Sequence, residues 1–505
     1  MAGKKEKRLV VLVHGWSVRS TETYGGLPDR LKREARRKGL DLDVRNIWLG
    51  EYVSFHDEVR VADLARGFQA ALQREAGDTL DGGQRFVCIT HSTGGPVVRA
   101  WLQHFYLARG RKTTPLSHLI MLAPANFGSA LAQLGKKRLS RLKSWLEGVQ
   151  PGTGVLDWLE LGSPESWELN QRWLEDHARI IGPRGTWPFV LIGQSIDHKL
   201  YDHLNAYTGE MGSDGVVRTA AANINAHSVT LKQQKPRAGK DGQGYTAPKL
   251  SVGKTATCED VPMAVLPGLS HSGERMGIMR SVPAEGGDHP TVTGILDCLN
   301  VKTRADYDRL RERFDALTAN TQASERVETL DLPGPFDRTR IKDPCSMVIF
   351  RVTDDQGRAV TDFDLLLTAG GDDDPDRLPP GFFVDRQKNS RAGNTVTYYV
   401  NHALMKGSDA VRRKDEDDGD VIRGERRPAE SLGIRITPHP GDGFVHYLPA
   451  SLHATPKNLD HFVRANQTTL VDIVLRRVIH SGVFELTRDL EPHDFTDQPP
   501  GPLIE

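Results

Sequence analysis

The stretch FVCITHSTGGPVV, residues 86–98, holds the residues best suited to covalent chemistry. An apolar, strand-like run leads to Ser92, and a glycine pair then opens a segment of helical composition. A sharp strand-to-helix turn lifts a serine hydroxyl out of a sheet, and the following helix N-terminus supplies positive potential for an oxyanion. Such a turn needs small residues two positions before and after the serine, here Thr90 and Gly94. The pattern therefore predicts Ser92 as a nucleophile; the alternative is an ordinary turn with a capping serine.

A nucleophilic serine also needs backbone N–H donors for the oxyanion, one from the next residue and one from the loop after an earlier strand. Thr93 follows Ser92 and offers the first donor. The segment LVHGW, residues 12–16, ends the first apolar run. Gly15 permits an unusual turn there, which would direct the N–H of Trp16 into the site. Thr93 and Trp16 are thus the predicted oxyanion hole.

Three short motifs together resemble one family of enzymes. The chain has VHGW at residues 13–16, THSTGG at 90–95 and GSDGVV at 212–217. In these motifs it is similar to the α/β-hydrolase superfamily, particularly its lipase and phospholipase branches. Those branches have His-Gly after the first core strand, an H-S-x-G-G elbow and an acid in an S/N-D-G-x-V segment. The elbow departs from the usual G-x-S-x-G at Thr90. The resemblance covers about residues 8–300 and implies a serine esterase that needs no cofactor.

The same resemblance implies the partners of the serine, because in this family the acid and then the histidine follow it along the chain. Asp214 lies in the GSDGVV segment, and His271 lies in VLPGLSH, an apolar strand running into a loop. The acid would orient the imidazole, which takes the serine proton as general base. A rival acid is Asp197, which lies nearer the end of the apolar run at residues 187–194.

Two further histidines are expected to support the site. His14 lies in the expected oxyanion loop and His91 precedes the nucleophile, so we expect hydrogen bonds from both and base catalysis from neither. No HExxH, P-loop or GxGxxG motif occurs, so zinc hydrolysis, nucleotide hydrolysis and dinucleotide binding have no support in the sequence. No metal site is predicted.

The elements that would position these residues alternate in type. Up to about residue 300, short β-branched runs alternate with segments of helical period, which predicts a mostly parallel sheet covered by helices. Residues 61–72 place apolar side chains along one stripe of a helix, and residues 304–318 do so at a/d spacing. The predicted fold class is α/β, with an α/β-hydrolase domain over residues 1–320.

An insertion separates two of the expected strands. Residues 127–186 contain several amphipathic pieces and half of the eight tryptophans: Trp145, Trp158, Trp167 and Trp173. We expect a helical cap here. Its tryptophans either pack the insertion or face lipid as a lid, since Trp is common in both settings.

The sequence pattern changes after an expected linker at residues 321–342. Residues 343–505 contain short alternating strands separated by Asp, Gly and Pro, which predicts an antiparallel β-sandwich-like accessory domain with a polar tail. This domain is expected either to brace the first domain or to target the enzyme to its substrate. For targeting, the basic residues available to an anionic surface are Arg386, Lys388, Arg391, Arg412, Arg413 and Lys414.

The composition limits which binding partners and which cellular compartment can be expected for the protein. The 66 basic and 66 acidic residues cancel, so no whole-chain field favours nucleic acid or an anionic membrane. The four cysteines form no CxxC pair, which is typical of a reducing compartment. No apolar stretch reaches the roughly 20 residues of a membrane span, and the run at residues 9–13 is too short for a signal peptide. We expect a protein that is cytoplasmic as synthesised, with signal-independent export as an open alternative.

Together these features favour a serine hydrolase of lipid carboxylic esters, of lipase or phospholipase type, that works through an acyl-enzyme. The expected partner is a lipid or small-ester substrate, with local peripheral membrane contact left open and no protein partner indicated. The same triad also serves acyltransferases and thioesterases, and a hydrolase fold can persist as an inactive binding module. Accessory β modules also occur in bacterial phospholipase effectors, but the chain has no delivery motif.

Overall fold

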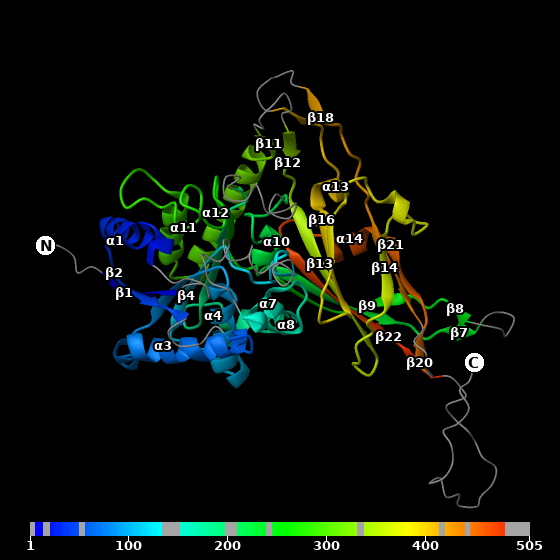
Figure 1. Ribbon diagram of the computed structural model, residues 1–505, viewed down its shortest axis with the longest axis horizontal. Helices are drawn as coiled ribbons and strands as arrows, with labels where there is room; N and C mark the ends of the chain where they lie inside the picture. Colours follow the sequence, from blue (N-terminus) through cyan, green and yellow to red (C-terminus); the bar gives the residue numbers. More distant parts are fainter. Residues whose placement is uncertain are drawn as a thin grey trace, which may run out of the picture.

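The structure, a computed structural model, describes nine stretches of the 505-residue chain. These are residues 6–13, 21–49, 56–133, 152–196, 210–238, 245–330, 338–413, 420–439 and 445–479. Their strands form two large sheets and several small ones. Figure 1 shows the two large sheets beside each other, with the amino-terminal region on the left.

The first sheet has six strands in the order β10-β5-β4-β3-β1-β2, and every pairing in it is parallel. The strands are β1 (Glu6–Val13), β2 (Leu40–Ile47), β3 (Phe86–His91), β4 (Leu116–Leu122), β5 (Trp187–Ile192) and β10 (Met263–Val265). β3 and β5 are buried along their whole length, as expected for inner strands covered on both faces. The predicted α/β-hydrolase sheet is confirmed.

Helices cover this sheet. In the view of Figure 1, α1, α11 and α12 lie above it and α3 lies below it. The main helices are α1 (Leu27–Arg37), α3 (Val61–Asp81), α4 (Gly94–Phe105), α11 (Pro290–Leu299) and α12 (Arg304–Ser324). The apolar stripes predicted at residues 61–72 and 304–318 are the buried faces of α3 and α12.

Two helices occupy the described part of the expected cap insertion, α7 (Thr153–Leu159) and α8 (Pro164–Ile180). Trp158, Trp167 and Trp173 are all buried here, and the guanidinium carbon of Arg351 lies 4.4 Å from the ring centre of Trp167. These three tryptophans therefore pack against protein and present no lipid-facing surface. Trp145 lies outside the described residues.

The second large sheet has the order β15-β16-β13-β22-β6-β9. Four of its strands come from the predicted accessory domain: β13 (Cys345–Asp354), β15 (Phe383–Lys388), β16 (Thr395–Asn401) and β22 (Thr468–Leu475). The other two, β6 (Ala226–Gln233) and β9 (Leu250–Cys258), come from the region that the sequence assigned to the hydrolase domain.

This arrangement differs from the sequence-based expectation in two ways. β22 pairs in parallel with both β13 and β6, so the sheet is mixed and not purely antiparallel. Residues 226–258 also belong to the second sheet in space, although they precede the expected linker. The physical reason is that strand pairing depends on complementary edges and faces, which a reading of local sequence periods does not connect.

A smaller sheet, β14-β19-β21, packs on one face of the second sheet. Its strands are β14 (Phe363–Thr368), β19 (Leu432–Pro438) and β21 (Ala450–Thr455). Val348, Tyr398 and Val471 of the second sheet share a core with this small sheet. On the opposite face, Met347 and Tyr399 belong to the core of the first region. The second sheet therefore lies between the helix-covered first sheet and the small sheet.

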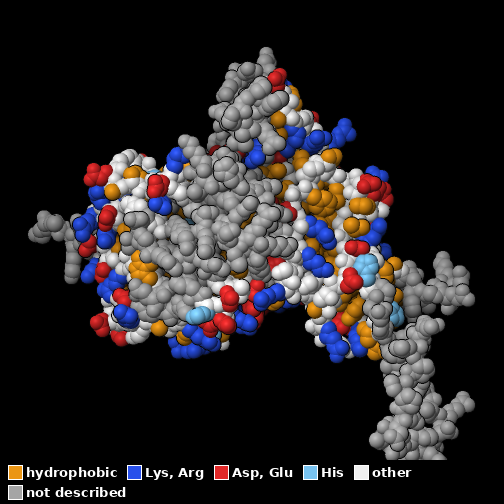
Figure 2. Space-filling model, in the orientation of Figure 1, with side chains coloured by type: hydrophobic (Ala, Val, Ile, Leu, Met, Phe, Trp, Pro, Cys, Tyr) orange, Lys and Arg blue, Asp and Glu red, His pale blue; other side chains and the backbone are white. Residues whose placement is uncertain are grey.

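The remaining elements are short. They are α10 (Thr219–Ala222), α13 (His402–Lys406), α14 (Pro456–Phe462), η1 (Thr21–Tyr24), η2 (Leu107–Arg109), η3 (Pro375–Arg377), and the strand pairs β7 (Arg237–Ala238) with β8 (Tyr245–Thr246), β11 (Val327–Leu330) with β12 (Arg338–Ile341), β17 (Val411–Arg412) with β18 (Val421–Arg423), and β20 (Val445–Tyr447) with β23 (Arg477–Ile479). No helix in the described ranges is long and apolar enough to cross a membrane. Figure 2 shows basic and acidic side chains intermixed over the described surface of one face.

Candidate active site

The turn between β3 and α4 carries Ser92 in a strained backbone conformation. Its φ is +52°, a value that L-residues rarely adopt outside special turns. The turn is held by backbone bonds, since Ser92 N donates to Leu122 O (3.1 Å) and Ser92 O accepts from Gly95 N (3.2 Å). A Cβ on Gly95 would lie 2.7 Å from the Pro124 side chain, so the helix start must be glycine there. This is the geometry of a nucleophile elbow.

A chain of hydrogen bonds runs inward from this serine. Ser92 Oγ lies 3.1 Å from Nε2 of His271, and Nδ1 of His271 lies 2.9 Å from Oδ2 of Asp214. The structure thus brings together three residues that are far apart in the sequence. Asp214 is fully buried and His271 is 5% exposed, so little water competes for these hydrogen bonds.

The carboxylate of Asp214 is held by its own turn. Its Oδ1 accepts backbone hydrogen bonds from Val216 (3.0 Å) and Val217 (2.8 Å), which leaves Oδ2 for the imidazole. The backbone of His271 also donates to Asp214 O at 3.0 Å. These bonds set the position of the acid relative to the imidazole. The rival acid, Asp197, lies outside the described residues.

His91 lies against His271, with ring centres 4.8 Å apart. Its Nε2 lies 3.1 Å from the backbone oxygen of His271, to which it can donate a hydrogen bond. Burial, and then the neighbouring His271, lowers the pKa of His91 to about 3, so this ring is neutral at physiological pH. The arrangement fits a supporting hydrogen bond of the kind expected from the sequence.

Thr93 and Gly94 lie where the elbow meets α4, with Thr93 6% exposed and Gly94 as the first residue of the helix. The N–H of Thr93 therefore belongs to the positive end of that helix. The other predicted oxyanion donor, Trp16, and the supporting residues His14 and Gly15 lie outside the described residues.

Comparison with solved structures decides the family. Phospholipase PlaB from Legionella pneumophila is 41% identical to this chain, with a TM-score of 0.82 over 99% of this chain and 100% of the PlaB chain. PlaB in complex with thio-NAD is 39% identical, with a TM-score of 0.80 over the same shares. This chain belongs to the PlaB phospholipase family. Neither a protein-family model nor a curated protein matches it.

As a member of the PlaB phospholipase family, the chain is an enzyme, a hydrolase of lipid esters. The resemblance to lipases and phospholipases drawn from the three motifs is confirmed. The similarity spans both regions of the chain. It therefore includes the C-terminal β-rich region, which contains none of the three motifs.

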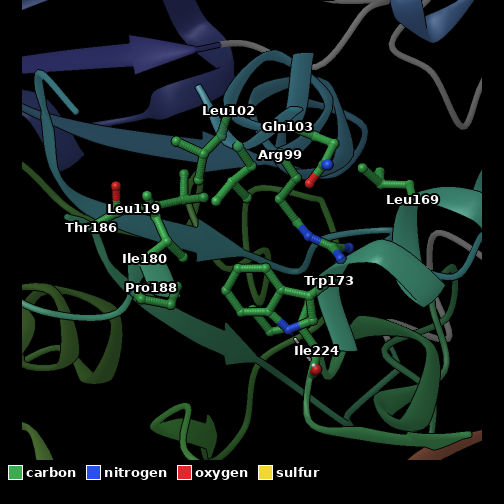
Figure 3. A pocket seen from close by; sticks show the side chains of 11 residues that line it. Arg99, Leu102, Gln103, Leu119, Leu169, Trp173, Ile180, Thr186, Pro188 and Ile224 are labelled. Carbon is green, nitrogen blue, oxygen red and sulfur yellow. Dashed lines mark hydrogen bonds between the residues drawn. The ribbon is translucent and has the colours of Figure 1, made fainter. Parts of the chain in front are cut away.

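Sequence reasoning missed a buried polar network behind the elbow helix of this PlaB family member. Arg99 of α4 is 3% exposed and donates to the side-chain oxygens of Asn126 (3.1 Å) and Asn170 (2.9 Å). Its guanidinium carbon lies 5.6 Å from the Trp173 ring, beside a cavity of about 10 Å³ (Figure 3). Burial lowers the pKa of Arg99 to about 9, and no described carboxylate forms an ion pair with it. The available signal was an arginine inside the apolar stripe of GGPVVRAWL.

Metal ligands were also sought within the ranges that the structure describes. No group of three His, Cys, Asp or Glu side chains there is arranged to hold a metal ion. A surface groove of about 740 Å³ is lined by residues of α3, α4, α7 and α8 and by Asn389 and Arg391, but by none of Ser92, His271 and Asp214.

Proposed function

We propose that this protein hydrolyses carboxylic esters of phospholipids, with Ser92 as nucleophile, His271 as general base and Asp214 as the acid that orients it. The observation that carries the proposal is the chain of hydrogen bonds from Ser92 through His271 to the buried Asp214, at 3.1 Å and 2.9 Å. The 41% identity to phospholipase PlaB over nearly the whole chain supports a phospholipid as the substrate.

The proposed reaction has two steps. The Ser92 oxygen attacks the ester carbonyl while its proton passes to Nε2 of His271, and Asp214 stabilises the resulting imidazolium. The N–H groups of Thr93 and Trp16 would stabilise the oxyanion, and His271 would return the proton to the leaving alcohol. Water then attacks the acyl-enzyme by the same route. Each of these roles uses a group of the protein, without a cofactor.

The test combines an active-site probe with a substrate series. A fluorophosphonate should label the protein, and the protein should cleave p-nitrophenyl esters and phospholipid vesicles. Ser92→Ala should abolish all three signals, whereas Ser117→Ala should not, because the hydroxyl of Ser117 bonds Phe86 O at the start of β3, the end opposite Ser92. Labelling that survives in Ser92→Ala would refute the nucleophile. Cleavage of short esters without any cleavage of vesicles would refute the phospholipid substrate.

The same experiment separates the other functions open to this fold. An acyltransferase would pass the acyl group to an added alcohol in preference to water, and a thioesterase would favour thioesters over oxygen esters. An inactive binding module would not be labelled at all. The hydrogen-bonded serine, histidine and aspartate favour hydrolysis over that last function.

Peripheral membrane contact is part of the proposal, because a phospholipid substrate lies in a bilayer. Three of the basic residues suggested for such contact already have partners in the protein. Arg386 Nε donates to the Tyr398 hydroxyl (3.1 Å), Lys388 Nζ donates to Thr361 O (2.8 Å), and Arg391 pairs with Asp157. These pairs make the three residues poorer candidates for holding a lipid surface. Sedimentation with anionic and neutral vesicles tests the contact directly.

A nicotinamide dinucleotide is a second ligand to test, because the related PlaB was solved in complex with thio-NAD. The chain has no GxGxxG motif, so a site would have to differ from the usual dinucleotide fold. Calorimetric titration of the full-length protein with thio-NAD should show saturable binding. Absence of heat and of any change in thermal stability would exclude this ligand.

A further inference from the structure

The turn that carries Asp214 lies on the segment where the chain crosses from one large sheet to the other. The chain leaves the first sheet at the end of β5, passes through Asp214 and α10, and enters the second sheet as β6. It returns through β9 to β10, and His271 follows. The acid and the base are therefore on the outgoing and the returning segments, and the second sheet lies between them in the sequence.

One flank of the acid turn is held by a buried cluster of charges. Arg218 is 1% exposed and makes two hydrogen bonds of 2.8 Å to the carboxylate of Glu210. It also donates to Asp385 of β15 at 2.5 Å. Its guanidinium carbon lies 4.1 Å from the ring centre of Tyr399 of β16. A residue four positions after Asp214 is thus fixed by two strands of the second sheet.

The other flank is held by the hydroxyl of Tyr399, which lies 3.0 Å from both Met211 O and Gly212 O. Gly212 has a φ of +66°, and a Cβ there would lie 2.6 Å from that hydroxyl. Burial raises the pKa of Tyr399 well above its usual value, so the hydroxyl stays protonated and can donate. The N–H of Thr219 also donates to Gly212 O at 2.7 Å, which closes the turn around Asp214.

These contacts come from one face of one sheet. Asp385 pairs with Tyr399 across antiparallel strands, so their side chains project on the same side. Tyr398 is the next residue on the same strand, and its hydroxyl bonds Leu365 O (2.6 Å) on the opposite face. A sheet positions such groups more rigidly than a loop does.

We propose that the second sheet positions the catalytic acid, with Tyr399 and Asp385 as the positioning residues that hold the Asp214 turn against His271. The proposal rests on the proposed function, because it gives these residues a role only if Asp214 orients the base. Neither residue is placed to touch substrate. Their effect passes through the backbone of Gly212 and the guanidinium of Arg218, and a small displacement of the acid is enough to slow proton transfer.

The test uses the full-length protein and a soluble short-chain ester, so that membrane contact plays no part. Tyr399→Phe removes one hydroxyl and should lower kcat on the order of tenfold with little change in KM. Asp385→Asn removes the charge that pairs with Arg218 and should do the same. The acid limb of the kcat/KM profile should also move to lower pH, because an imidazolium with a displaced carboxylate is less stable. A role in folding alone would lower activity without moving that limb.

Two variants serve as matched controls. Tyr398→Phe removes the hydroxyl of another buried tyrosine on the same strand, but on the face away from the hydrolase. Glu160→Gln weakens another contact between the regions, the bonds that this carboxylate accepts from Ser390 N (2.6 Å) and Ser390 Oγ (2.7 Å). Both controls should keep kcat within about twofold even if they lower the melting temperature. Equal losses of kcat in Tyr398→Phe and Tyr399→Phe would overturn the proposal.

A double variant separates this proposal from the proposed function. If Tyr399 acts through Asp214, adding Tyr399→Phe to Asp214→Asn should cause no further loss of kcat. A further tenfold loss would overturn the positioning role while leaving the nucleophile intact. Failure of the proposed function looks different, because Ser92→Ala would then retain activity. Should Asp385→Asn fail to fold, Tyr399→Phe alone still decides the outcome.

Discussion

The two large sheets of this protein are assembled by different routes. In the first sheet, the neighbouring strands β3, β4 and β5 follow one another along the chain with helices between them. In the second, β6 lies between β9 and β22, so that Ala226 pairs with Thr468. The proposed nucleophile, Ser92, needs only the first sheet, because a strand, a turn and a helix position it. The proposed acid, Asp214, needs both sheets, because it lies on the segment that joins them.

Removing the C-terminal strands of the second sheet should therefore have the largest effect on activity and on thermal stability. A protein ending at residue 325 would lose β13, β15, β16 and β22 and leave β6 and β9 as an isolated ribbon, which is marginally stable at best. The buried side chains of Val229 and Leu231 would be exposed. We expect this protein to lose cleavage of soluble esters and of vesicles together, and to show a lost or broadened thermal transition.

This truncation also decides between the two roles expected for the C-terminal region. A brace predicts joint loss of both activities, as argued here. Targeting predicts that a soluble short-chain ester is cleaved nearly normally while hydrolysis of vesicles falls. The contacts of Asp385 and Tyr399 with the acid turn favour the brace.

Within the first region, the serine and the histidine should be the most sensitive single positions. Ser92→Ala and His271→Ala should each lower ester turnover on the order of 10⁴- to 10⁶-fold, because members of a triad act as a unit. Melting temperature and circular dichroism should stay close to those of the unmodified protein. Near-normal turnover in either variant would contradict the assignment.

Substitution of the proposed acid, Asp214, should lower kcat less than substitution of Ser92 or His271. Asp214→Asn keeps the shape of the side chain but favours the wrong imidazole tautomer, with an expected loss on the order of 10⁴-fold in kcat. Asp197→Asn should cost far less, because Nδ1 of His271 donates its hydrogen bond to Asp214. Steady-state kinetics on one ester compares the two directly, and the opposite ranking would move the acid to Asp197.

The same contrast explains what could be predicted from the sequence. Ser92 follows a local pattern, a strand before a sharp turn, whereas Asp214 and His271 were proposed from the motifs and the residue order of the family that the chain resembles. The second sheet could be recognised as β-rich, but the membership of residues 226–258 could not, because their pairing with β22 is not local. Nothing in NTVTYYVNHAL distinguishes Tyr399 from Tyr398 until the register shows which face each one occupies.

Two buried arginines, one at the junction of the two regions and one inside the first region, allow the stabilities of the two places to be compared. Arg218 at the junction pairs with the carboxylates of Glu210 and Asp385, whereas Arg99 inside the first region bonds the neutral amides Asn126 and Asn170. Arg218→Met would leave the buried carboxylate of Glu210 and the partly buried one of Asp385 without their cation, and breaking a buried pair costs about 3–5 kcal/mol. Arg99→Met would leave only amide oxygens unpaired, at about 1–3 kcal/mol, and it would also remove a buried charge that pairs with no carboxylate among the described residues. Urea denaturation of both variants should therefore rank Arg218→Met as the more destabilised protein. Equal midpoints would mean that the junction is no more sensitive to a lost charge than the interior of the hydrolase.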